Sequence, residues 1–70
     1  MDDIIGKYYG SEEYDNRESH IRMDNDGVYT VDFWKDYKLV ESRRMDPDGI
    51  PRSLRYAEDA AENWVMGYIP

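Results

Sequence analysis

The chain has 70 residues, no cysteine and a formal net charge of −7 at pH 7. This length allows one small domain with a thin core, and the lack of cysteine excludes disulfides and cysteine-ligated zinc as sources of stability. No apolar run reaches the roughly 20 residues of a membrane-spanning helix, and residues 1–6 lack the basic and apolar regions of a signal peptide. We therefore expect a cytoplasmic protein without a membrane partner.

The negative charge is concentrated in the first third of the chain. Residues 1–26 carry eight acidic side chains against three basic ones, whereas residues 35–55 carry six basic against four acidic. An acidic surface repels phosphate backbones and favours a partner with a basic surface, including one that normally holds nucleic acid. Simple solubility is the alternative explanation of the same charge.

Residues 1–18 form an acidic stretch in which tyrosines alternate with glycines. Tyr8, Tyr9 and Tyr14 are set among Gly6 and Gly10. A short strand, a frayed turn and an arm that becomes ordered on binding are all compatible with this pattern, so we assign it no structure. We treat residues 1–18 as an N-terminal arm and residues 19–70 as the single domain.

Three strands are predicted after the arm, at residues 19–23, 28–34 and 37–44. In the second of these, Tyr29, Val31 and Phe33 fall on one face and the intervening side chains on the other. Asn, Asp and Gly at residues 24–27 favour a tight turn, as do residues 46–49. The polar residues 41–44 suit a strand at the edge of a sheet.

One helix is predicted near the C-terminus. Ser53 is the expected N-cap and Gly67 the expected end of the helix. Its apolar side chains recur at helical spacing and are expected to pack on Tyr29, Val31 and Phe33; they are Leu54, Ala57, Ala61, Trp64, Val65 and Tyr68. The predicted fold is therefore α+β, with a three-stranded antiparallel meander packed by one C-terminal helix.

The sequence carries no pattern typical of catalysis or of cofactor binding. His20 is the only histidine, and we expect it to be an exposed strand residue because only Glu18 is near enough in sequence to orient it. The turns at 24–27 and 46–49 resemble parts of calcium loops, but Arg22 and Arg44 stand where a first carboxylate ligand is required. We expect no enzyme activity, no cofactor and no metal.

Aromatic residues are more numerous than so small a core can hold. The chain has seven tyrosines and two tryptophans, and these residue types are enriched at interfaces. Tyr37 and Tyr56 are among the aromatics that we expect to be exposed. The predicted protein-binding surface combines other aromatics with the acidic face of the helix; it comprises Glu58, Asp59, Glu62, Glu12, Glu13, Tyr8, Tyr9, Tyr14 and Trp34.

Residues 28–33, 38–44 and 56–64 together resemble the arm-type DNA-binding domains of phage integrases. Those domains have a Tyr-x-Val-x-Phe strand, a basic hairpin and a helix with alanines and a late tryptophan. The resemblance implies a phage or mobile-element origin, which small phage proteins with a similar helix also suggest. It further implies an alternative DNA-binding face, formed by Lys38, Arg43, Arg44, Arg52 and Arg55. Asp32, Asp36 and Glu41 on the same sheet depart from that basic pattern.

The favoured function is a small acidic protein-binding module that inhibits or modulates a host protein with a basic, nucleic-acid-binding surface. Such a module would act as a DNA mimic in the host cytoplasm, since carboxylates can imitate phosphate spacing. The DNA-binding domain described above is one alternative. A homo-oligomeric structural component is the other, because a thin core and an edge strand favour a homodimer.

Overall fold

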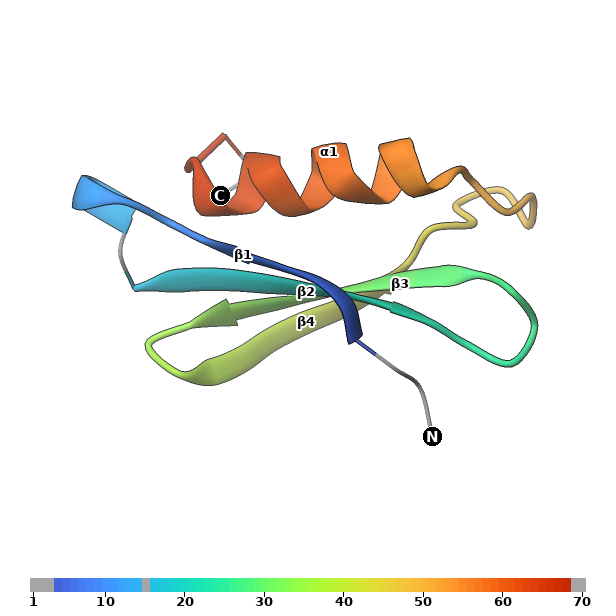
Figure 1. Ribbon diagram of the computed structural model, residues 1–70, viewed down its shortest axis with the longest axis horizontal. Helices are drawn as coiled ribbons and strands as arrows, with labels where there is room; N and C mark the ends of the chain where they lie inside the picture. The colour runs from blue at the N-terminus through green and yellow to red at the C-terminus, as the bar shows by residue number, and fades with distance from the viewer. Residues whose placement is uncertain (1–3, 15, 69–70) are drawn as a thin grey trace.

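The computed structural model describes residues 4–14 and 16–68. The elements in chain order are β1 (Ile4–Tyr9), the short 3-10 helix η1 (Glu12–Tyr14), β2 (Arg17–Met23), β3 (Tyr29–Lys35), β4 (Lys38–Arg44) and α1 (Leu54–Val65). The four strands form one antiparallel sheet in the order β1-β2-β3-β4. Helix α1 lies along one face of this sheet and leaves the other face uncovered (Figure 1).

The α+β class and the C-terminal helix are confirmed, but the prediction of three strands is wrong. The fourth strand, β1, comes from the stretch that we left unassigned, and it pairs with β2 with Lys7 opposite His20. A register shift between Ile4 and Gly6 interrupts the ladder. The adjacent pairs Ile4-Ile5 and Tyr8-Tyr9 hide the alternation typical of a strand, which explains why the sequence pattern did not reveal it.

Local hydrogen bonds fix the two hairpin turns that follow β2 and β3. The Asp24 carboxylate accepts the backbone N–H groups of Asp26 and Val28 at 2.9 and 3.0 Å. Asp36 and Tyr37 both have positive φ, at 54° and 65°, as a two-residue hairpin turn of this twist requires. Asn16 donates to the Asp36 carboxylate at 3.1 Å, which holds this second turn against the start of β2.

The core lies between α1 and the middle of the sheet, as the periodicity predicted. Ile21, Val31 and Phe33 are at most 2% exposed. Ala57 and Ala61 are fully buried, and their small side chains let the helix lie close to β2. There the Ser19 hydroxyl donates to the Ala61 carbonyl at 3.0 Å, which satisfies a buried polar group.

The ends of the helix agree with the sequence, whereas two of the expected core residues do not. Ser53 caps the first turn by accepting the Tyr56 N–H, and Gly67 has a φ of 80°. However, Leu54 is 38% and Tyr68 72% exposed. Leu54 is the first residue of α1, and Tyr68 follows Gly67, where the left-handed backbone turns the chain away from the helical face.

Candidate protein-binding surface

One long side of α1 faces β1, and two carboxylates of the predicted acidic face lie there. The Tyr8 hydroxyl of β1 donates to the Glu58 carboxylate at 3.4 Å. Glu62 lies one helical turn further on, so both carboxylates occupy the same stripe of the helix. Burial, together with the nearby Glu58 and Glu62 carboxylates, raises the pKa of Tyr8 above its ordinary value. Tyr8 is therefore neutral and available as a donor to Glu58 at neutral pH.

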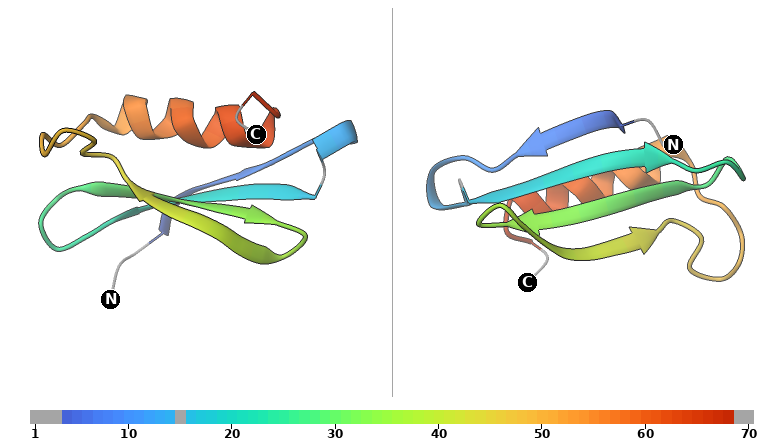
Figure 2. Two further views of the ribbon diagram at one scale, coloured as in Figure 1. Left: turned by 180° about the vertical axis from the view of Figure 1, so that it is seen from behind. Right: turned by 90° about the horizontal axis from the view of Figure 1, so that it is seen from below.

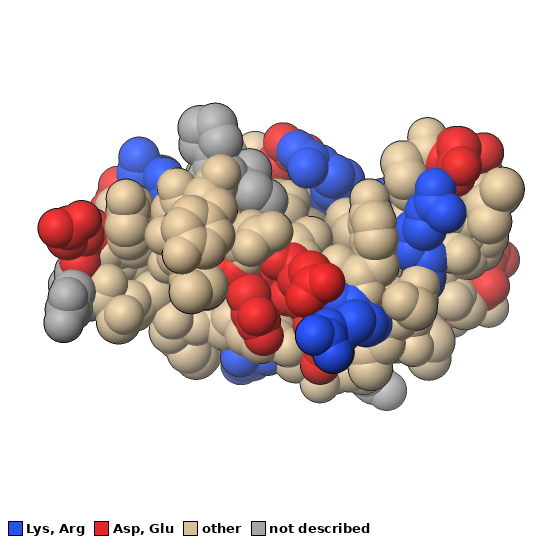
Figure 3. Space-filling model, turned by 90° about the horizontal axis from the view of Figure 1, so that it is seen from above, with Lys and Arg blue, Asp and Glu red and all other residues tan. Residues whose placement is uncertain are grey.

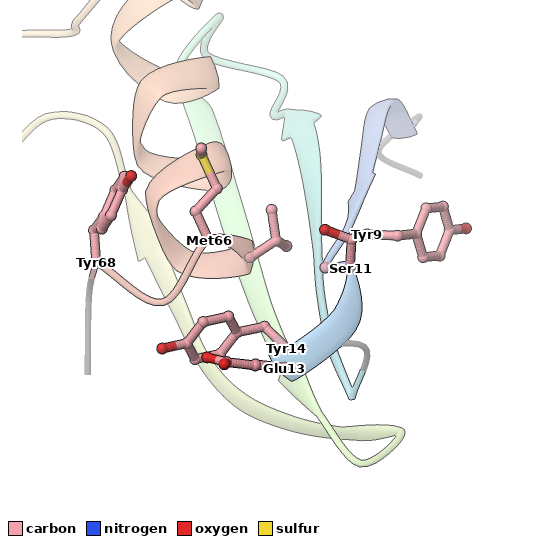
Figure 4. A pocket seen from close by; sticks show the side chains of 8 residues that line it. Tyr9, Ser11, Glu13, Tyr14, Met66 and Tyr68 are labelled. Carbon is pink, nitrogen blue, oxygen red and sulfur yellow. The ribbon is translucent and has the colours of Figure 1, made fainter.

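The same stripe leads into a groove at the C-terminal end of α1, which we call the end groove. It encloses about 250 Å³ and is lined by Tyr9, Gly10, Ser11, Glu13, Tyr14, Val65, Met66 and Tyr68. Tyr9 is 64%, Met66 51% and Tyr68 72% exposed. Figure 4 shows Tyr14 and Glu13 beneath the end of the helix, and Tyr9 pointing away from it. The end groove thus combines exposed aromatic surface with a carboxylate.

Close packing beneath the end groove holds the segment after β1 against the helix. A Cβ atom at Gly67 would lie 2.3 Å from Cζ of Tyr14, so only glycine permits this contact. Arg17 lies over the rings of both Tyr14 and Trp64, at 5.2 and 4.4 Å from their centroids. Arg17 also donates to the Trp64 carbonyl at 3.1 Å. The partial negative charge at the C-terminal end of a helix stabilises a cation in this position. The end groove is therefore a preformed feature.

Ion pairing divides the carboxylates of this molecule into two groups. Most described carboxylates have a basic partner within the chain; these are Glu18, Asp24, Asp32, Glu41, Asp46, Asp48 and Asp59. No ion pair between described residues involves the other five, which are Glu13, Asp26, Asp36, Glu58 and Glu62. Asp26 and Asp36 lie singly in the two hairpin turns, whereas Glu13, Glu58 and Glu62 lie along the first side of α1. We call Tyr8, Glu58, Glu62 and the end groove with its Glu13 the acidic strip. Within the described residues, no basic side chain forms an ion pair with the carboxylates of this strip.

The structure brings together only part of the predicted protein-binding set. Glu58, Glu62, Tyr8, Tyr9, Glu13 and Tyr14 all lie on the acidic strip. Asp59 lies on the other side of α1, in an ion pair with Arg55 at 3.5 Å. Trp34 is on the uncovered face of the sheet, where it lies against His20. The Glu12 side chain lies outside the part of the structure that is described.

The basic residues of the alternative DNA-binding face do not form one surface. Arg43 is opposite Val31 and Arg44 opposite Thr30, so the two side chains lie on different faces of the sheet. Four of the five residues already have carboxylate partners, at 2.7 Å for Arg43–Glu41, 2.8 Å for Arg44–Asp24, 2.9 Å for Arg52–Asp48 and 3.5 Å for Arg55–Asp59. This arrangement disfavours contact with a phosphate backbone.

Figure 3 views the molecule from the helix side and shows acidic groups at several places, with basic groups between them. The space between β4 and α1 on this side is a second groove, of about 320 Å³, which we call the edge groove. It is lined by Arg43, Met45, Tyr56, Asp59, Ala60 and Asn63. Tyr56 is 45% exposed, as expected. Because its lining holds one basic and one acidic side chain, Arg43 and Asp59, the edge groove lacks the single sign of charge that marks the acidic strip.

The uncovered face of the sheet carries a polar network instead of an apolar layer. Arg22 donates to both carboxylate oxygens of Asp32, at 2.6 and 2.9 Å, and the Ser42 hydroxyl donates at 2.6 Å. Burial acts to raise the pKa of Asp32, but the bonds from Arg22 and Ser42 outweigh it and leave the pKa below its ordinary value. Asp32, which is only 6% exposed, is therefore a stable buried anion.

His20 lies in this network and is not the exposed residue that we expected. Its side chain is 13% exposed and contacts the Glu18 carboxylate, while Asp32 is its partner across the ladder. A nucleophilic triad needs a histidine between the hydroxyl and the carboxylate, but here Asp32 itself accepts the Ser42 hydroxyl. The Ser42 hydroxyl thus bonds to a carboxylate that Arg22 already holds and not to a histidine, so the arrangement differs from a nucleophilic triad.

Comparisons with protein-family models, curated proteins and solved structures found no match. The resemblance to integrase arm-type domains and the phage origin therefore stay predictions. Within residues 4–14 and 16–68, no helix has the length and apolar character needed to cross a bilayer.

Sequence reasoning missed Met66 and Tyr68 as parts of the site. The helical spacing predicts a buried Tyr68 and gives no signal for Met66. Both lie next to Gly67, whose φ of 80° turns the chain back over Tyr14. The glycine was a usable signal for the end of the helix, but the position of Tyr14 beneath it depends on β1 pairing with β2, which the sequence did not reveal.

Proposed function

We propose that this protein is a non-enzymatic protein-binding module and that its acidic strip receives a basic segment of a partner protein. The observation that carries the proposal is that three of the described carboxylates without a basic partner among the described residues, Glu13, Glu58 and Glu62, share one surface with exposed tyrosines, whereas the other two, Asp26 and Asp36, lie apart in the hairpin turns. Elsewhere acidic side chains mostly pair with neighbouring bases. An unmatched acidic surface attracts basic partners and speeds their association.

The residue types of the acidic strip suit lysine and arginine side chains. Carboxylates form ion pairs with the cationic groups. Tyrosine rings attract the same cations through cation–π interactions and pack against the aliphatic part of the lysine or arginine side chain. Met66 and Tyr68 add exposed apolar area at the end groove. Tyrosine side chains are common at the centres of protein interfaces, because they bury a large area at low entropic cost.

A narrower proposal concerns the kind of partner. The net charge of −7 and the low pI of 4.4 favour a protein whose basic surface ordinarily holds nucleic acid. The chain would then occupy that surface as a phage-encoded inhibitor of a host protein. The support for this proposal is the net charge and the resemblance to phage integrase domains given above. Identification of the partner is therefore the first experiment.

The test is capture of partners from lysate at low salt by the full chain, with identification by mass spectrometry. The informative variant is Glu58→Gln/Glu62→Gln, and the matched control is Asp26→Asn/Asp36→Asn, which removes the same charge from two turns. We expect the wild type and the control to retain one partner and the strip variant to bind it about tenfold more weakly. Equal loss by both variants, or no retained partner, would contradict the proposal.

A further inference from the structure

The outer edge of β4 is a second candidate interaction surface, distinct from the acidic strip. β4 ends the sheet order, and all seven of its residues are exposed. Figure 2, in its view from below, shows α1 behind β2 and β3 while β4 lies to one side of it. An edge strand of this kind presents backbone N–H and C=O groups to another strand. The edge groove separates β4 from α1, so the helix does not obstruct that edge.

The hydrogen bonds to β3 indicate which backbone groups of β4 point outward. The Met45 N–H donates to the Tyr29 carbonyl at 2.8 Å, in continuation of the pairs Thr30↔Arg44 and Val31↔Arg43. In an antiparallel ladder, inward and outward residues alternate. Glu41 and Arg43 therefore direct their backbone groups to β3, as Met45 does, whereas Ser42 directs its N–H and C=O to the free edge.

We infer that this edge pairs with β4 of a second copy of the chain, about a two-fold axis at Ser42. In that register the two Ser42 residues exchange a pair of backbone hydrogen bonds, and Glu41 lies directly opposite the partner's Arg43. The symmetry repeats this ion pair on the other side of the axis. Non-hydrogen-bonded pairs such as this one bring their side chains closest together.

The neighbouring registers are disfavoured by charge. A shift of two residues in one direction places Glu41 opposite Glu41, and a shift in the other direction places Arg43 opposite Arg43. Shifts of one residue would exchange the two faces of the strand. Charged side chains usually protect an edge strand from pairing, but here Glu41 and Arg43 are self-complementary. Their existing contact at 2.7 Å within one strand shows that both side chains lie on the same face.

Charge exchange at these two positions tests the inference by sedimentation equilibrium. We expect wild type to show a monomer–dimer equilibrium, and Glu41→Arg alone and Arg43→Glu alone each to weaken it at least about tenfold. The two single variants mixed in equal amounts should associate again, as should the double exchange Glu41→Arg/Arg43→Glu, because both restore opposite charges across the axis. Circular dichroism of each variant confirms that the fold is retained.

Three results would overturn the inference. The first is a wild type that stays monomeric at about 1 mM, which would leave the edge to a strand of another protein. The second is a dimer that survives both single exchanges, which would place the interface elsewhere. The third is failure of the mixed variants to associate while each remains folded. None of these measurements involves the acidic strip, so the proposed function is tested separately.

Discussion

The two long sides of α1 differ in how they meet the sheet. On the β1 side, Tyr8 bonds to Glu58, and Tyr14 packs beneath Gly67, so the helix is tied to the first hairpin. On the β4 side, the edge groove separates the helix from an exposed strand in which Glu41 and Arg43 pair with each other. The β1 side therefore presents carboxylates without a basic partner among the described residues, and the β4 side presents an open strand edge.

The largest expected effect comes from Trp64, which packs the C-terminal half of α1 onto β2 and β3. Its ring lies 5.2 Å from Phe33 and 4.4 Å from the Arg17 guanidinium, and its Nε1 donates to the Trp34 carbonyl at 3.0 Å. We expect Trp64→Ala to lower the free energy of unfolding by about 3–5 kcal/mol in urea denaturation. The control Leu54→Ala, at a position 38% exposed, should cost much less; similar losses would contradict this role of Trp64.

The packing on the β1 side is tested by Gly67→Ala. Gly27→Ala is the matched control, since both glycines have a φ of 80° but a Cβ at Gly27 would meet nothing within 4 Å. The control should lose about 1–2 kcal/mol of stability from the left-handed backbone alone. Gly67→Ala should lose at least about 1 kcal/mol more, because the added methyl overlaps the Tyr14 ring. Thermal unfolding measures both, and equal losses would show that Tyr14 moves freely.

A smaller effect is expected for Tyr8→Phe, which removes the hydroxyl that bonds to Glu58. We expect a loss of about 0.5–1 kcal/mol at pH 7. The folded state holds the Tyr8 proton to a higher pH than the unfolded state does. This contribution is therefore complete below about pH 10 and is lost as the pH rises through the folded pKa.

The pH dependence of unfolding provides the corresponding measurement. Stability of the wild type should fall more steeply above about pH 10 than that of Tyr8→Phe. Parallel alkaline limbs for the two proteins would show that the contact between Tyr8 and Glu58 does not form in solution.

The smallest stability effects are expected from the surface charges themselves. Asp59→Asn on the β4 side breaks an exposed ion pair and should cost at most about 0.5 kcal/mol. Glu58→Gln/Glu62→Gln should change the free energy of unfolding by at most about 0.5 kcal/mol, because the glutamine oxygen can still accept the Tyr8 hydroxyl while two like charges one helical turn apart are removed. Urea denaturation at low salt measures whether each variant raises or lowers the free energy of unfolding. A marked loss of stability in the Glu58→Gln/Glu62→Gln variant would assign these carboxylates a structural role.

The sequence predicted most of the helix and the three later strands because apolar residues recur at helical spacing in α1 and alternate with polar residues in the strands. Ala57, Ala61 and Trp64 recur on one helical face, and Val31 and Phe33 on one face of a strand, so burial follows from spacing. β1 escaped prediction because its register shift breaks the alternation, and its partner β2 lies beyond an intervening turn. The acidic residues of the site can be read from the sequence. Which carboxylates form ion pairs with basic side chains cannot, because that depends on the fold.

Pairing depends on which charges the sheet brings together. Arg43 and Arg44 are adjacent in sequence yet lie on opposite faces, and each finds its own carboxylate. Asp59 and Glu58 are likewise adjacent, but among the described ion pairs Arg55 pairs with Asp59 and not with Glu58. Composition alone therefore could not separate the acidic strip from the rest of the negative charge.

The most direct test of the account is an NMR titration of the ¹⁵N-labelled full chain with a short lysine-rich peptide at low salt. We predict that the largest changes in amide chemical shift occur at β1, η1 and residues 58–68, and that Glu58→Gln/Glu62→Gln reduces them while Asp26→Asn/Asp36→Asn does not. Shifts spread evenly over all acidic residues, or centred on β4 and Asp59, would contradict the claim that the acidic strip is the binding surface.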